Sequence, residues 1–400
     1  MRTVVVGNGI AGVIFSKTLR DLNPQMEIDI YTEEKYHYYP RPNLIEFLAL
    51  NLPYEKIFAF PEKWYKDRNL NVHLQESVRK IDVDSQKVEI KGGKKENFDV
   101  LFLANGARPF IPPFKGVDKK GVFTLRTVDD CMAILDYLKN HPKVTIIGGG
   151  LLGLEIARGM RARGAEVEVL EYFEHLLPRQ LDVQGASLLK QQIEKMGIKV
   201  RLGSATEAVL GQKEVEGLRL KEGNELKTEM AIVAAGVRSD IDLAKHAGLE
   251  VDRGVVVNDY LRTTHSRVYA GGDNLQHRGK NYGIIPAAFS QAKVAAHNAA
   301  GEPQLYRGTV PSNTLKVMGI HLTSIGLIKP EKSSYRIWRR EDREKGIYKK
   351  VVVHEGIPVG AVWLGTKKGI NEINRVISQK VNIEKWEDSI LQDDFDFSVL

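Results

Sequence analysis

Two glycine-rich segments carry the strongest chemical signal in this 400-residue chain. Residues 7–12 and 148–153 both read G-x-G-x-x-G, and each segment lies between an apolar run and a helical pattern. In this arrangement the glycines permit a tight turn and a close approach of the backbone to a phosphate, while the helix N-terminus supplies hydrogen-bond donors and a favourable dipole. Each segment therefore predicts a site for the pyrophosphate of a dinucleotide.

An acidic residue follows each glycine segment by about 20 residues, near the end of the next apolar run. These residues are Glu33 after the first segment and Glu171 after the second. A carboxylate at this point accepts hydrogen bonds from ribose hydroxyls and repels a 2′-phosphate. Glu171 therefore favours NADH over NADPH as the nicotinamide cofactor, although Arg161 and Arg163 nearby would attract a phosphate.

The elements that must position these residues read as two copies of one strand–turn–helix–strand unit. Short β-branched runs at 3–6 and 144–147 precede the glycines, and the runs 28–31 and 167–170 follow the helices. Two such units predict an α/β fold with two Rossmann-like dinucleotide-binding domains.

The segments between and after these units have different patterns. Val78–Ile90 and Phe98–Leu103 alternate like antiparallel strands, and the proline-dense stretch Ala107–Pro113 reads as a linker. From Tyr306 onward, short strands and a helical segment near Asn371–Gln379 predict a small C-terminal α+β domain. We expect the acidic segment Asp393–Phe397 to form a mobile tail, or alternatively a tail that shields a basic docking patch.

The composition excludes several other kinds of chemistry. Cys131 is the one cysteine in the sequence, which rules out an intramolecular disulfide, a CxxC redox motif and a cysteine-built metal site. The 10 histidines are scattered, so no metal site is expected. The net charge of +7 is modest for this length and does not by itself indicate nucleic-acid binding.

The location of the protein is predicted from the same features. No stretch of the sequence is long and apolar enough to form a membrane-spanning helix, and the first residues leave no room for a signal peptide. A single cysteine is typical of a reducing compartment. We therefore expect a cytoplasmic protein with no membrane and no nucleic-acid partner.

Four further features carry a resemblance to a known family. They are Tyr39–Leu44, similar to a Y-x-R-P-x-L segment beside a flavin; Leu103–Pro109, similar to an A-T-G-x-x-P crossover but with Asn105 in place of the threonine; Tyr269–Asp273, similar to Y-A-x-G-D; and the pair Leu315–Ile320 and Gly360–Val362, similar to a small C-terminal domain. Together with the two glycine segments, they make the chain resemble the FAD-dependent pyridine-nucleotide oxidoreductases with a glutathione-reductase-like fold. The resemblance is strongest to the NADH:rubredoxin oxidoreductases and to the flavin-binding part of assimilatory nitrite reductase large subunits.

The resemblance implies an order of domains and cofactors. The first unit binds FAD, and the second unit, which is inserted into the first, binds NADH. The implied FAD-binding domain comprises residues 1–109 and 237–305, the NAD-binding domain residues 110–236, and the C-terminal domain residues 306–400.

The resemblance also implies the residues of the site. Glu155 corresponds to a glutamate close to the nicotinamide and the flavin, and Arg41 lies beside the flavin, so both are expected to be catalytic. Asp273 is expected at the ribityl and pyrophosphate region of FAD, and the Val78 backbone near its adenine. The full set of expected cofactor-binding residues is Gly7, Gly9, Ile10, Ala11, Gly12, Glu33, Arg41, Pro42, Val78, Ala104, Asn105, Gly106, Gly148, Gly150, Leu151, Leu152, Gly153, Glu155, Glu171, Gly236, Gly272, Asp273, Ile285 and Pro286.

Residue types that this chain lacks limit the reaction expected of it. Relatives that work through a thiol carry a redox cysteine or a cysteine pair near the first unit, where this chain has Pro40–Phe47. Cys131 falls in a helical pattern and is expected to be a small buried hydrophobe. The resemblance therefore implies hydride transfer from NADH to flavin N5 and direct release of electrons to a small iron–sulfur carrier of the rubredoxin or ferredoxin type.

Many relatives that reduce such carriers have lysine in place of Glu46; if that lysine pairs with the glutamate matching Glu155, the pair is absent here.

Two other functions remain open. As an alternative, the chain resembles a flavin subunit that exchanges electrons between NAD(H) and a larger iron–sulfur complex of nitrite reductase or oxoacid dehydrogenase type. It also resembles flavoproteins whose redox state regulates protein binding. An electron-transfer partner would be an acidic iron–sulfur protein or subunit. The segment Lys329–Lys350, with nine Lys or Arg against four Asp or Glu, is either a docking patch for such a partner or a solvated face, which interleaved charges usually form.

Overall fold

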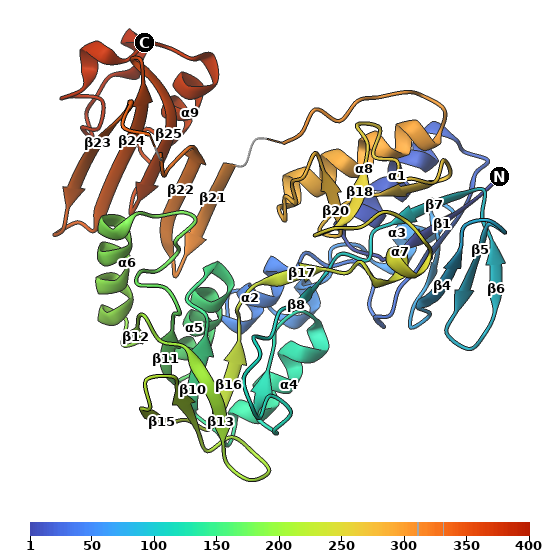
Figure 1. Cartoon of the computed structure of the whole chain (residues 1–400), viewed down its shortest axis with the longest axis horizontal. Coiled ribbons are helices and arrows are strands. Elements are labelled where there is room, and N and C mark those ends of the chain that lie inside the picture. Colours follow the sequence, from blue (N-terminus) through green and yellow to red (C-terminus); the bar gives the residue numbers. More distant parts are fainter. Residues whose placement is uncertain (310–311, 331) are drawn as a thin grey trace. The chain divides into compact units, whose positions relative to one another are not determined.

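The structure is a computed structural model that describes residues 1–309, 312–330 and 332–400, with the backbone alone for Ser312–Val317. The chain divides into two compact units (Figure 1). Unit 1 comprises Met1–Phe47, Asn51–Pro109 and Val237–Thr309, and unit 2 comprises Leu48–Leu50, Phe110–Gly236 and Val310–Leu400. Each of the two glycine segments therefore lies in a unit of its own.

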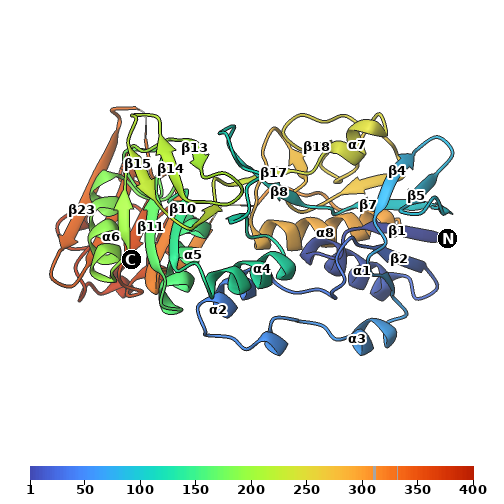
Figure 2. The ribbon, with the colours of Figure 1, turned by 90° about the horizontal axis from the view of Figure 1, so that it is seen from below.

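Unit 1 is built on a parallel sheet with the strand order β19-β7-β1-β2-β3. Its central strands are almost wholly buried, as is usual when helices and loops cover both faces of a parallel sheet. Helices α1 and α8 pack against each other and lie side by side in both views (Figures 1 and 2). The bounds are β1 Arg2–Val6, α1 Ile10–Leu22, β2 Glu27–Tyr31, β3 Asn71–His73, β7 Val100–Leu103, β19 Val268–Ala270 and α8 Ile285–Ala299.

Strand β7 corrects one expectation from the sequence. The alternation at Phe98–Leu103 suggests an antiparallel strand, but β7 lies parallel to both of its neighbours, β1 and β19. All four residues of Val100–Leu103 are buried, and a continuous apolar run is typical of a strand covered on both faces. Val78–Ile90 does form antiparallel strands, β4 (Val78–Asp82) and β5 (Lys87–Ile90), which make a separate sheet with β6 (Lys95–Asn97).

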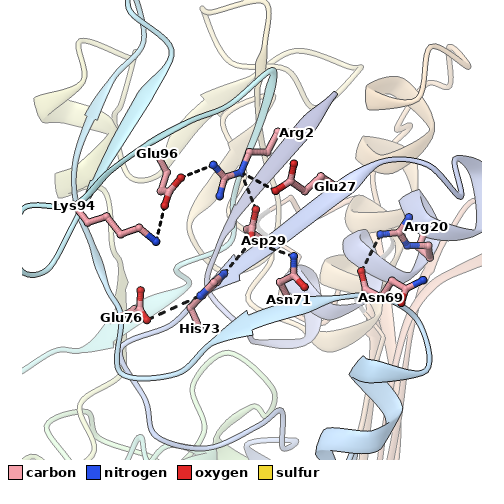
Figure 3. A network of polar contacts seen from close by, with 10 residues as sticks. All are labelled: Arg2, Arg20, Glu27, Asp29, Asn69, Asn71, His73, Glu76, Lys94 and Glu96. Atoms are coloured by element: carbon pink, nitrogen blue, oxygen red, sulfur yellow. Dashed lines mark hydrogen bonds and ion pairs between the residues drawn. The ribbon is translucent and has the colours of Figure 1, made fainter.

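A polar network around the buried Asp29 joins the first strands of unit 1 (Figure 3). The Asp29 carboxylate in β2 lies 2.8 Å from Arg2 Nε of β1 and 2.8 Å from His73 Nε2 of β3. Arg2 also pairs with Glu96, which binds Lys94 at 2.7 Å. Burial alone would raise the pKa of Asp29, but the hydrogen bonds and charges of His73 and Arg2 outweigh it and hold that pKa below its usual value. Charge therefore helps to fix the order of β1, β2 and β3.

The chain passes between the units on two paired strands. β8 (Ala107–Pro109) and β17 (Val237–Ser239) are antiparallel to each other, so the stretch expected to be a linker begins as a strand. Pro109 is tolerated because it lies at the end of a two-stranded ribbon. The other elements that lie mainly in unit 1 are α2 Pro42–Leu48, a 3-10 turn at Tyr54–Lys56, α3 Glu62–Lys66, α7 Asp242–His246, β18 Val255–Val257 and β20 Leu275–His277.

Unit 2 contains a second parallel sheet, with the order β12-β11-β10-β16-β9. Strand β10 is central in this sheet as β1 is in the first, and α5 follows it as α1 follows β1, which confirms the two Rossmann-like units. The bounds are β9 Val122–Phe123, α4 Val128–Leu138, β10 Lys143–Ile147, α5 Leu151–Ala162, β11 Glu166–Leu170, α6 Val183–Lys195, β12 Lys199–Arg201 and β16 Met230–Val233. A small antiparallel sheet consists of β13 Thr206–Leu210, β14 Gly217–Leu220 and β15 Glu225–Lys227.

The C-terminal part of unit 2 is an antiparallel sheet with the order β21-β22-β25-β24-β23. Helix α9 (Ile370–Gln379) packs on β25 and buries Ile373 and Val376 against Trp363, which confirms the small α+β domain. The strands are β21 Ser312–Val317, β22 Ile320–Gly326, β23 Tyr335–Asp342, β24 Ile347–His354 and β25 Ile357–Leu364, and 3-10 turns follow at Glu384–Trp386 and Phe397–Val399. Within the described residues, no helix combines the length and the apolar character needed to cross a membrane.

The C-terminal residues correct a second expectation. Phe395, Phe397 and Leu400 pack against the core of this sheet, and Asp393 binds Lys349 at 2.7 Å. The acidic residues of the segment suggest a solvated tail, but the aromatic residues that alternate with them supply apolar area for burial. The segment is therefore packed against the domain rather than mobile.

Candidate functional site

The first glycine segment forms the turn between β1 and α1. Gly7 has φ +106°, and a Cβ there would collide with the carbonyl group of Ala104 at the end of β7. A Cβ on Gly12 would in turn collide with the carbonyl of Gly7. Gly9 precedes α1 without a side-chain cap, and the space in which its Cβ would stand is open. Close packing therefore requires glycine at 7 and 12, while position 9 leaves room beside the unpaired N–H groups of the first helical turn.

The second glycine segment repeats this geometry between β10 and α5. Gly148 has φ +121°, and its Cβ would stand against the carbonyl of Ala234 at the end of β16. Gly153 is pressed against the carbonyl of Gly148, and Gly150 leaves open space before an uncapped helix. An uncapped helix N-terminus with open space over it fits a phosphate group, because donors and dipole both favour an anion. Both loops therefore fit the pyrophosphate of a dinucleotide.

The expected residues of unit 1 gather at the carboxyl ends of its parallel strands. Ala104 follows β7, and Gly272 follows β19 with the place of its Cβ 3.1 Å from the Ala11 side chain. Ligands of open α/β sheets bind at this end of the strands. Also in unit 1, Gly106 (φ +76°) lies before β8, Val78 is buried at the start of β4, and Ile285 and Pro286 lie in the first turn of α8. In unit 2, Gly236 (φ +100°) lies before β17, and Leu151 and Leu152 lie in the first turn of α5.

The strand registers show that the two acidic residues do not occupy equivalent positions. β1 pairs with β2 in the same register as β10 pairs with β11, so the residue after the second strand is Thr32 in unit 1 and Glu171 in unit 2. The N–H of Thr32 donates to the His73 carbonyl at 3.1 Å, and that of Glu171 donates to the Arg201 carbonyl at 2.8 Å. Glu33, the acid expected to match Glu171, therefore lies one residue beyond the position equivalent to Glu171.

The environments of these residues differ as well. Glu171 is buried, and its carboxylate accepts hydrogen bonds from the N–H groups of Gly149 at 2.7 Å and Phe173 at 2.9 Å. Gly149 is the second residue of the glycine segment, so Glu171 supports its own loop directly. Glu33 is exposed. After the larger influence of Asp240, its charge contributes to a pKa of Arg108 above the usual value.

Asn105 joins parts of unit 1 that are distant in sequence. Its Nδ2 donates to the carbonyl of Asp240 at 2.7 Å, and its Oδ1 accepts from Nδ2 of the fully buried Asn274 at 2.8 Å. The hydroxyl of Ser239 donates to the carbonyl of Asp273 at 2.6 Å. These bonds connect the two strands that pass between the units with the loop that carries Asp273. The sequence motifs point to Asn105 and Asp273 but not to Asn274 or Ser239, whose contacts depend on the tertiary fold.

Arg41 is engaged within unit 1. Its Nη2 binds Glu34 Oε1 at 2.6 Å, its Nη1 contacts the Tyr39 hydroxyl, and its guanidinium carbon lies 4.8 Å from the centre of the Tyr39 ring. The Tyr39 hydroxyl also donates to Glu34 at 2.5 Å. Pro42 directly after it begins α2. The structure therefore fixes Arg41 by a carboxylate and an aromatic ring immediately before a helix.

Glu155 lies in the second turn of α5, and both of its carboxylate oxygens are engaged. Oε1 accepts from the N–H of Met318 at 2.5 Å, and Oε2 accepts from Arg158 Nε at 2.9 Å. Glu46, where the resemblance implies a lysine in many relatives, accepts from Asn51 Nδ2 at 2.8 Å. The partners of Glu155 in this structure are therefore an arginine of its own helix and a backbone group of the C-terminal sheet.

Cys131 has no exposed surface in α4. Burial raises the pKa of its thiol to about 12. A thiol of this kind remains protonated at neutral pH and is a poor nucleophile. Among the residues that the structure describes, no group of three or more His, Cys, Asp or Glu is arranged to hold a metal ion.

The basic segment Lys329–Lys350 forms many ion pairs within unit 2. Lys350 and Arg339 bind Asp182, Lys349 and Arg340 bind Asp393, Arg336 binds Glu384 and Glu387, Arg343 binds Glu341, and Lys345 binds Asp342. Lys349 and Lys350 are 2% exposed and so lie inside the protein rather than on its surface. Nearby carboxylates thus neutralise much of the positive charge that suggested a docking patch.

Two aromatic residues beside Glu171 were not expected in the site. Tyr172 and Phe173 are 65% and 53% exposed, with ring centroids 5.3 Å apart. Exposed aromatic rings directly after the acid expected to bind a ribose would offer a flat apolar surface to a base. Two adjacent aromatic residues in an otherwise polar loop are the signal that could have identified them.

The fold and the two loops define a class of protein: the oxidoreductases that hold two dinucleotides on two Rossmann-like units and carry a small C-terminal domain. Residues 1–299 match the family model described as pyridine nucleotide-disulphide oxidoreductase, and residues 311–381 match the model described as rubredoxin NAD+ reductase C-terminal domain. The chain belongs to the pyridine nucleotide-disulphide oxidoreductase family. Members of this family are oxidoreductases that use FAD and NADH.

Several relatives are similar over most of this chain. It is 36% identical to the NAD(P)H nitrite reductase of Bacillus subtilis over 97% of its own length and 49% of that protein. It is 33% identical to the assimilatory nitrate reductase electron transfer subunit of the same organism, over 91% of this chain and 47% of that one. The chain thus spans about half the length of these two relatives.

A third relative has a similar length. The NADH-rubredoxin oxidoreductase of Clostridium acetobutylicum is 32% identical over 92% of this chain and 93% of that protein. The crystal structure of NADH:rubredoxin oxidoreductase from that organism superimposes with a TM-score of 0.79 at 30% identity, covering 96% of this chain and 95% of the other.

Proposed function

We propose that this chain is an NADH-dependent flavoprotein reductase that passes electrons from NADH through FAD to a small iron–sulfur carrier of the rubredoxin or ferredoxin type. The observation that carries the proposal is the relation to a NADH-rubredoxin oxidoreductase over 92% of this chain and 93% of that protein. The match of residues 311–381 to a rubredoxin NAD+ reductase C-terminal domain supports it. Bound FAD would accept a hydride and release electrons one at a time.

In the proposal, residues 1–109 and 237–305 hold FAD, residues 110–236 hold NADH, and residues 306–400 form the C-terminal domain. The N–H groups at the start of α1 and α5 bind the two pyrophosphates, because both helices are uncapped beside open space. Asp273 binds FAD, and Glu155 and Arg41 lie at the reacting ends of the cofactors. No cysteine takes part, because Cys131 is buried with a pKa near 12.

We further propose that NADH is preferred to NADPH. Glu171 presents a carboxylate where the adenosine ribose of the second dinucleotide would lie, and a 2′-phosphate there would be repelled. Its two backbone hydrogen bonds hold it in place. We propose the cytoplasm as the location, which the single cysteine supports.

A second candidate is a flavin subunit that exchanges electrons between NAD(H) and a larger iron–sulfur enzyme. The 36% identity to a nitrite reductase twice as long favours it, because this chain matches only 49% of that protein. The internal pairing of the basic segment also weakens the argument for a docking patch for a free acidic carrier there.

Rapid-mixing kinetics with the purified protein distinguishes these candidates. We expect the protein to purify with FAD, to be bleached by NADH, and to be reoxidised rapidly by rubredoxin or ferredoxin. Slow reoxidation by every free carrier, together with co-purification of iron–sulfur subunits, would favour the second candidate. A protein that purifies without FAD, and that does not take it up, would contradict both.

A further inference from the structure

A contact between α5 and the C-terminal sheet reaches the glutamate expected beside the nicotinamide. Glu155 Oε1 accepts a hydrogen bond from the N–H of Met318 at 2.5 Å, although 163 residues separate the two in sequence. Arg158 holds the other oxygen at 2.8–2.9 Å. Only 13% of the Glu155 side chain is exposed. A carboxylate held through both oxygens in a largely buried position has one orientation rather than several.

Met318 stands in a tight turn whose conformation is unfavourable for it. Val317 pairs with Ile320, so Met318 and Gly319 are the two residues that connect β21 and β22. Their φ angles are +56° and +83°, and positive φ at both positions is the signature of a turn that prefers Asn-Gly. Methionine is strained there, but its side chain is 2% exposed. The residue is therefore placed by its contacts rather than by turn propensity, and strain of this kind is concentrated at functional sites.

A second set of contacts keeps the C-terminal sheet against the same part of unit 2. Asp182, which caps α6, binds Lys350 of β24 at 2.8 Å and the Tyr348 hydroxyl at 2.7 Å. Gln192 at the other end of that helix donates to the Gly346 carbonyl at 3.1 Å. Figure 1 shows α6 beside this sheet and the β21–β22 hairpin close to α5. The Met318–Gly319 turn that contacts Glu155 therefore belongs to a sheet that is also held to α6, by contacts separate from Glu155.

We propose that the Met318–Gly319 turn is a positioning element of the nicotinamide site. The Met318 N–H and Arg158 together hold the Glu155 carboxylate in the orientation in which it meets the reactive end of NADH. The inference rests on the proposed function, in which Glu155 lies beside the nicotinamide. It assigns to the C-terminal domain a part in the reaction of NADH, although that domain contains no glycine loop.

The test compares two substitutions that strain a turn equally. Gly319→Ala puts a side chain at φ +83° in open space, and Gly223→Ala does the same at φ +90° in the turn between β14 and β15. The limiting rate of FAD reduction at saturating NADH is measured by rapid mixing, and the affinity of the oxidised protein for ADP-ribose by calorimetry. We expect Gly319→Ala to lower the limiting rate at least about 10-fold, because small misplacements near a reacting centre cost rate. ADP-ribose affinity should stay unchanged in both variants, and Gly223→Ala should keep the wild-type rate.

Further variants separate failure of this inference from failure of the proposed function. Glu155→Gln should slow FAD reduction with ADP-ribose affinity unchanged; if it reduces at the wild-type rate, the role of Glu155 and the positioning role built on it both fall. If Glu155→Gln is slow while Gly319→Ala matches Gly223→Ala, the turn has no positioning role but the proposed function stands. Should Gly319→Ala fail to fold, Met318→Gly removes the buried side chain that places the turn, and Arg158→Met removes the other donor. Both variants should lower the limiting rate with ADP-ribose affinity unchanged, and the wild-type rate in either variant would overturn the inference.

Discussion

The two glycine loops have the same backbone course but are held by different side chains. In unit 2, Glu171 follows the second strand and binds the N–H of Gly149 within the loop. In unit 1 the equivalent residue is Thr32, and Glu33 is displaced by one position and exposed. At the ends of β7 and β16, the strands on the other side of β1 and β10, the polar side chain is found in unit 1 instead. Asn105 binds two neighbouring segments of unit 1, whereas its equivalent in unit 2 is an alanine.

This difference suits a resident cofactor in one loop and an exchanging one in the other. In the loop of unit 1, Asn8 Oδ1 accepts a hydrogen bond from the Tyr65 hydroxyl at 3.2 Å, a contact that does not involve the residue that would meet the ribose. Asn105, Asn274 and Ser239 join neighbouring segments of the same unit. The loop of unit 2 is supported by the same carboxylate that would bind the ribose of NADH. Binding of NADH would therefore be coupled to the order of this loop, since both would use Glu171.

The largest expected effect comes from the third glycine of each loop. Gly12→Ala and Gly153→Ala both force a Cβ against the carbonyl of the first glycine. Gly12→Ala should lower FAD affinity about 100-fold, because the loop must shift away from the phosphates. Gly153→Ala should leave FAD bound and slow its reduction at low NADH by a similar factor. Flavin absorbance after gel filtration and stopped-flow reduction measure the two effects, and loss of FAD in Gly153→Ala would break the assignment of one cofactor to each loop.

A second test compares the buried carboxylates of the two units at low pH. Burial opposes ionisation of Asp182, but hydrogen bonds from Lys350, Tyr348 and the Gly185 N–H outweigh it and lower its pKa to about 2, against 3.8 in an unfolded chain. A lowered pKa contributes stability above the unfolded value, and that stability is lost as pH falls from about 4 to about 2. It amounts to about 2 kcal/mol. Asp29 in unit 1 shifts in the same direction.

Chemical unfolding at pH 5, 4 and 3 measures this loss, with pH values spaced at about one unit across the window. Asp182→Asn should be less stable at pH 5 and should lose less stability on acidification than the wild type. An equally steep loss in Asp182→Asn would show that other groups determine acid unfolding.

Substitution of Glu171 is expected to have a smaller effect, a loss of NADH affinity and of the preference for NADH over NADPH. Glu171→Gln keeps the size of the side chain but removes the charge and one acceptor oxygen, so it weakens both the loop contact and the ribose contact. We expect KM for NADH to rise about 10-fold and the preference for NADH over NADPH to fall, since a charge-assisted hydrogen bond is worth about 1.5–3 kcal/mol. Glu33→Gln serves as the matched variant and should change FAD affinity less. An unchanged ratio of kcat/KM for the two nucleotides in Glu171→Gln would remove this residue from the NADH site.

The smallest expected effect is that of Asn105. Asn105→Ala leaves its partner groups on Asp240 and Asn274 with one bond fewer, which should lower the free energy of unfolding by about 1–2 kcal/mol. Asn298→Ala removes comparable bonds to the Tyr260 and Gln304 carbonyls elsewhere in unit 1. Both variants should lower Tm, but Asn105→Ala alone should weaken FAD binding. Equal FAD affinity in the two variants would mean that Asn105 contributes stability without positioning the site.

Much of the fold could be predicted because its signals are local. Gly7 and Gly148 must adopt positive φ under the carbonyl of a neighbouring strand, so the motif, the strand before it and the helix after it occur together. The two Rossmann-like units and the helix at Ile370–Gln379 follow from such local patterns. Phe98–Leu103 was misjudged because a short apolar run does not reveal whether its partners are parallel.

The polar contacts could not be predicted in this way. Lys349 and Lys350 are conspicuous charges in the sequence, yet both are buried against carboxylates that lie 44 and 168 residues away. The same holds for Phe395 and Phe397, whose neighbours Asp394 and Asp396 made the segment look solvated. A charge count describes a segment, whereas the partner of each charge depends on which distant segment lies beside it.

The sequence by itself determined that two dinucleotide loops exist, where they lie, and that one cysteine leaves no thiol pair for redox chemistry. It did so because glycine sterics, strand–helix alternation and cysteine number are properties of the chain. Tertiary structure alone decided which groups meet: Glu171 and the Gly149 N–H within unit 2, Asn105 and Asn274 across unit 1, and the Met318 N–H and Glu155. Hydrogen bonds of 2.5–2.8 Å require atoms from distant segments to meet, and only the packed sheets bring them together.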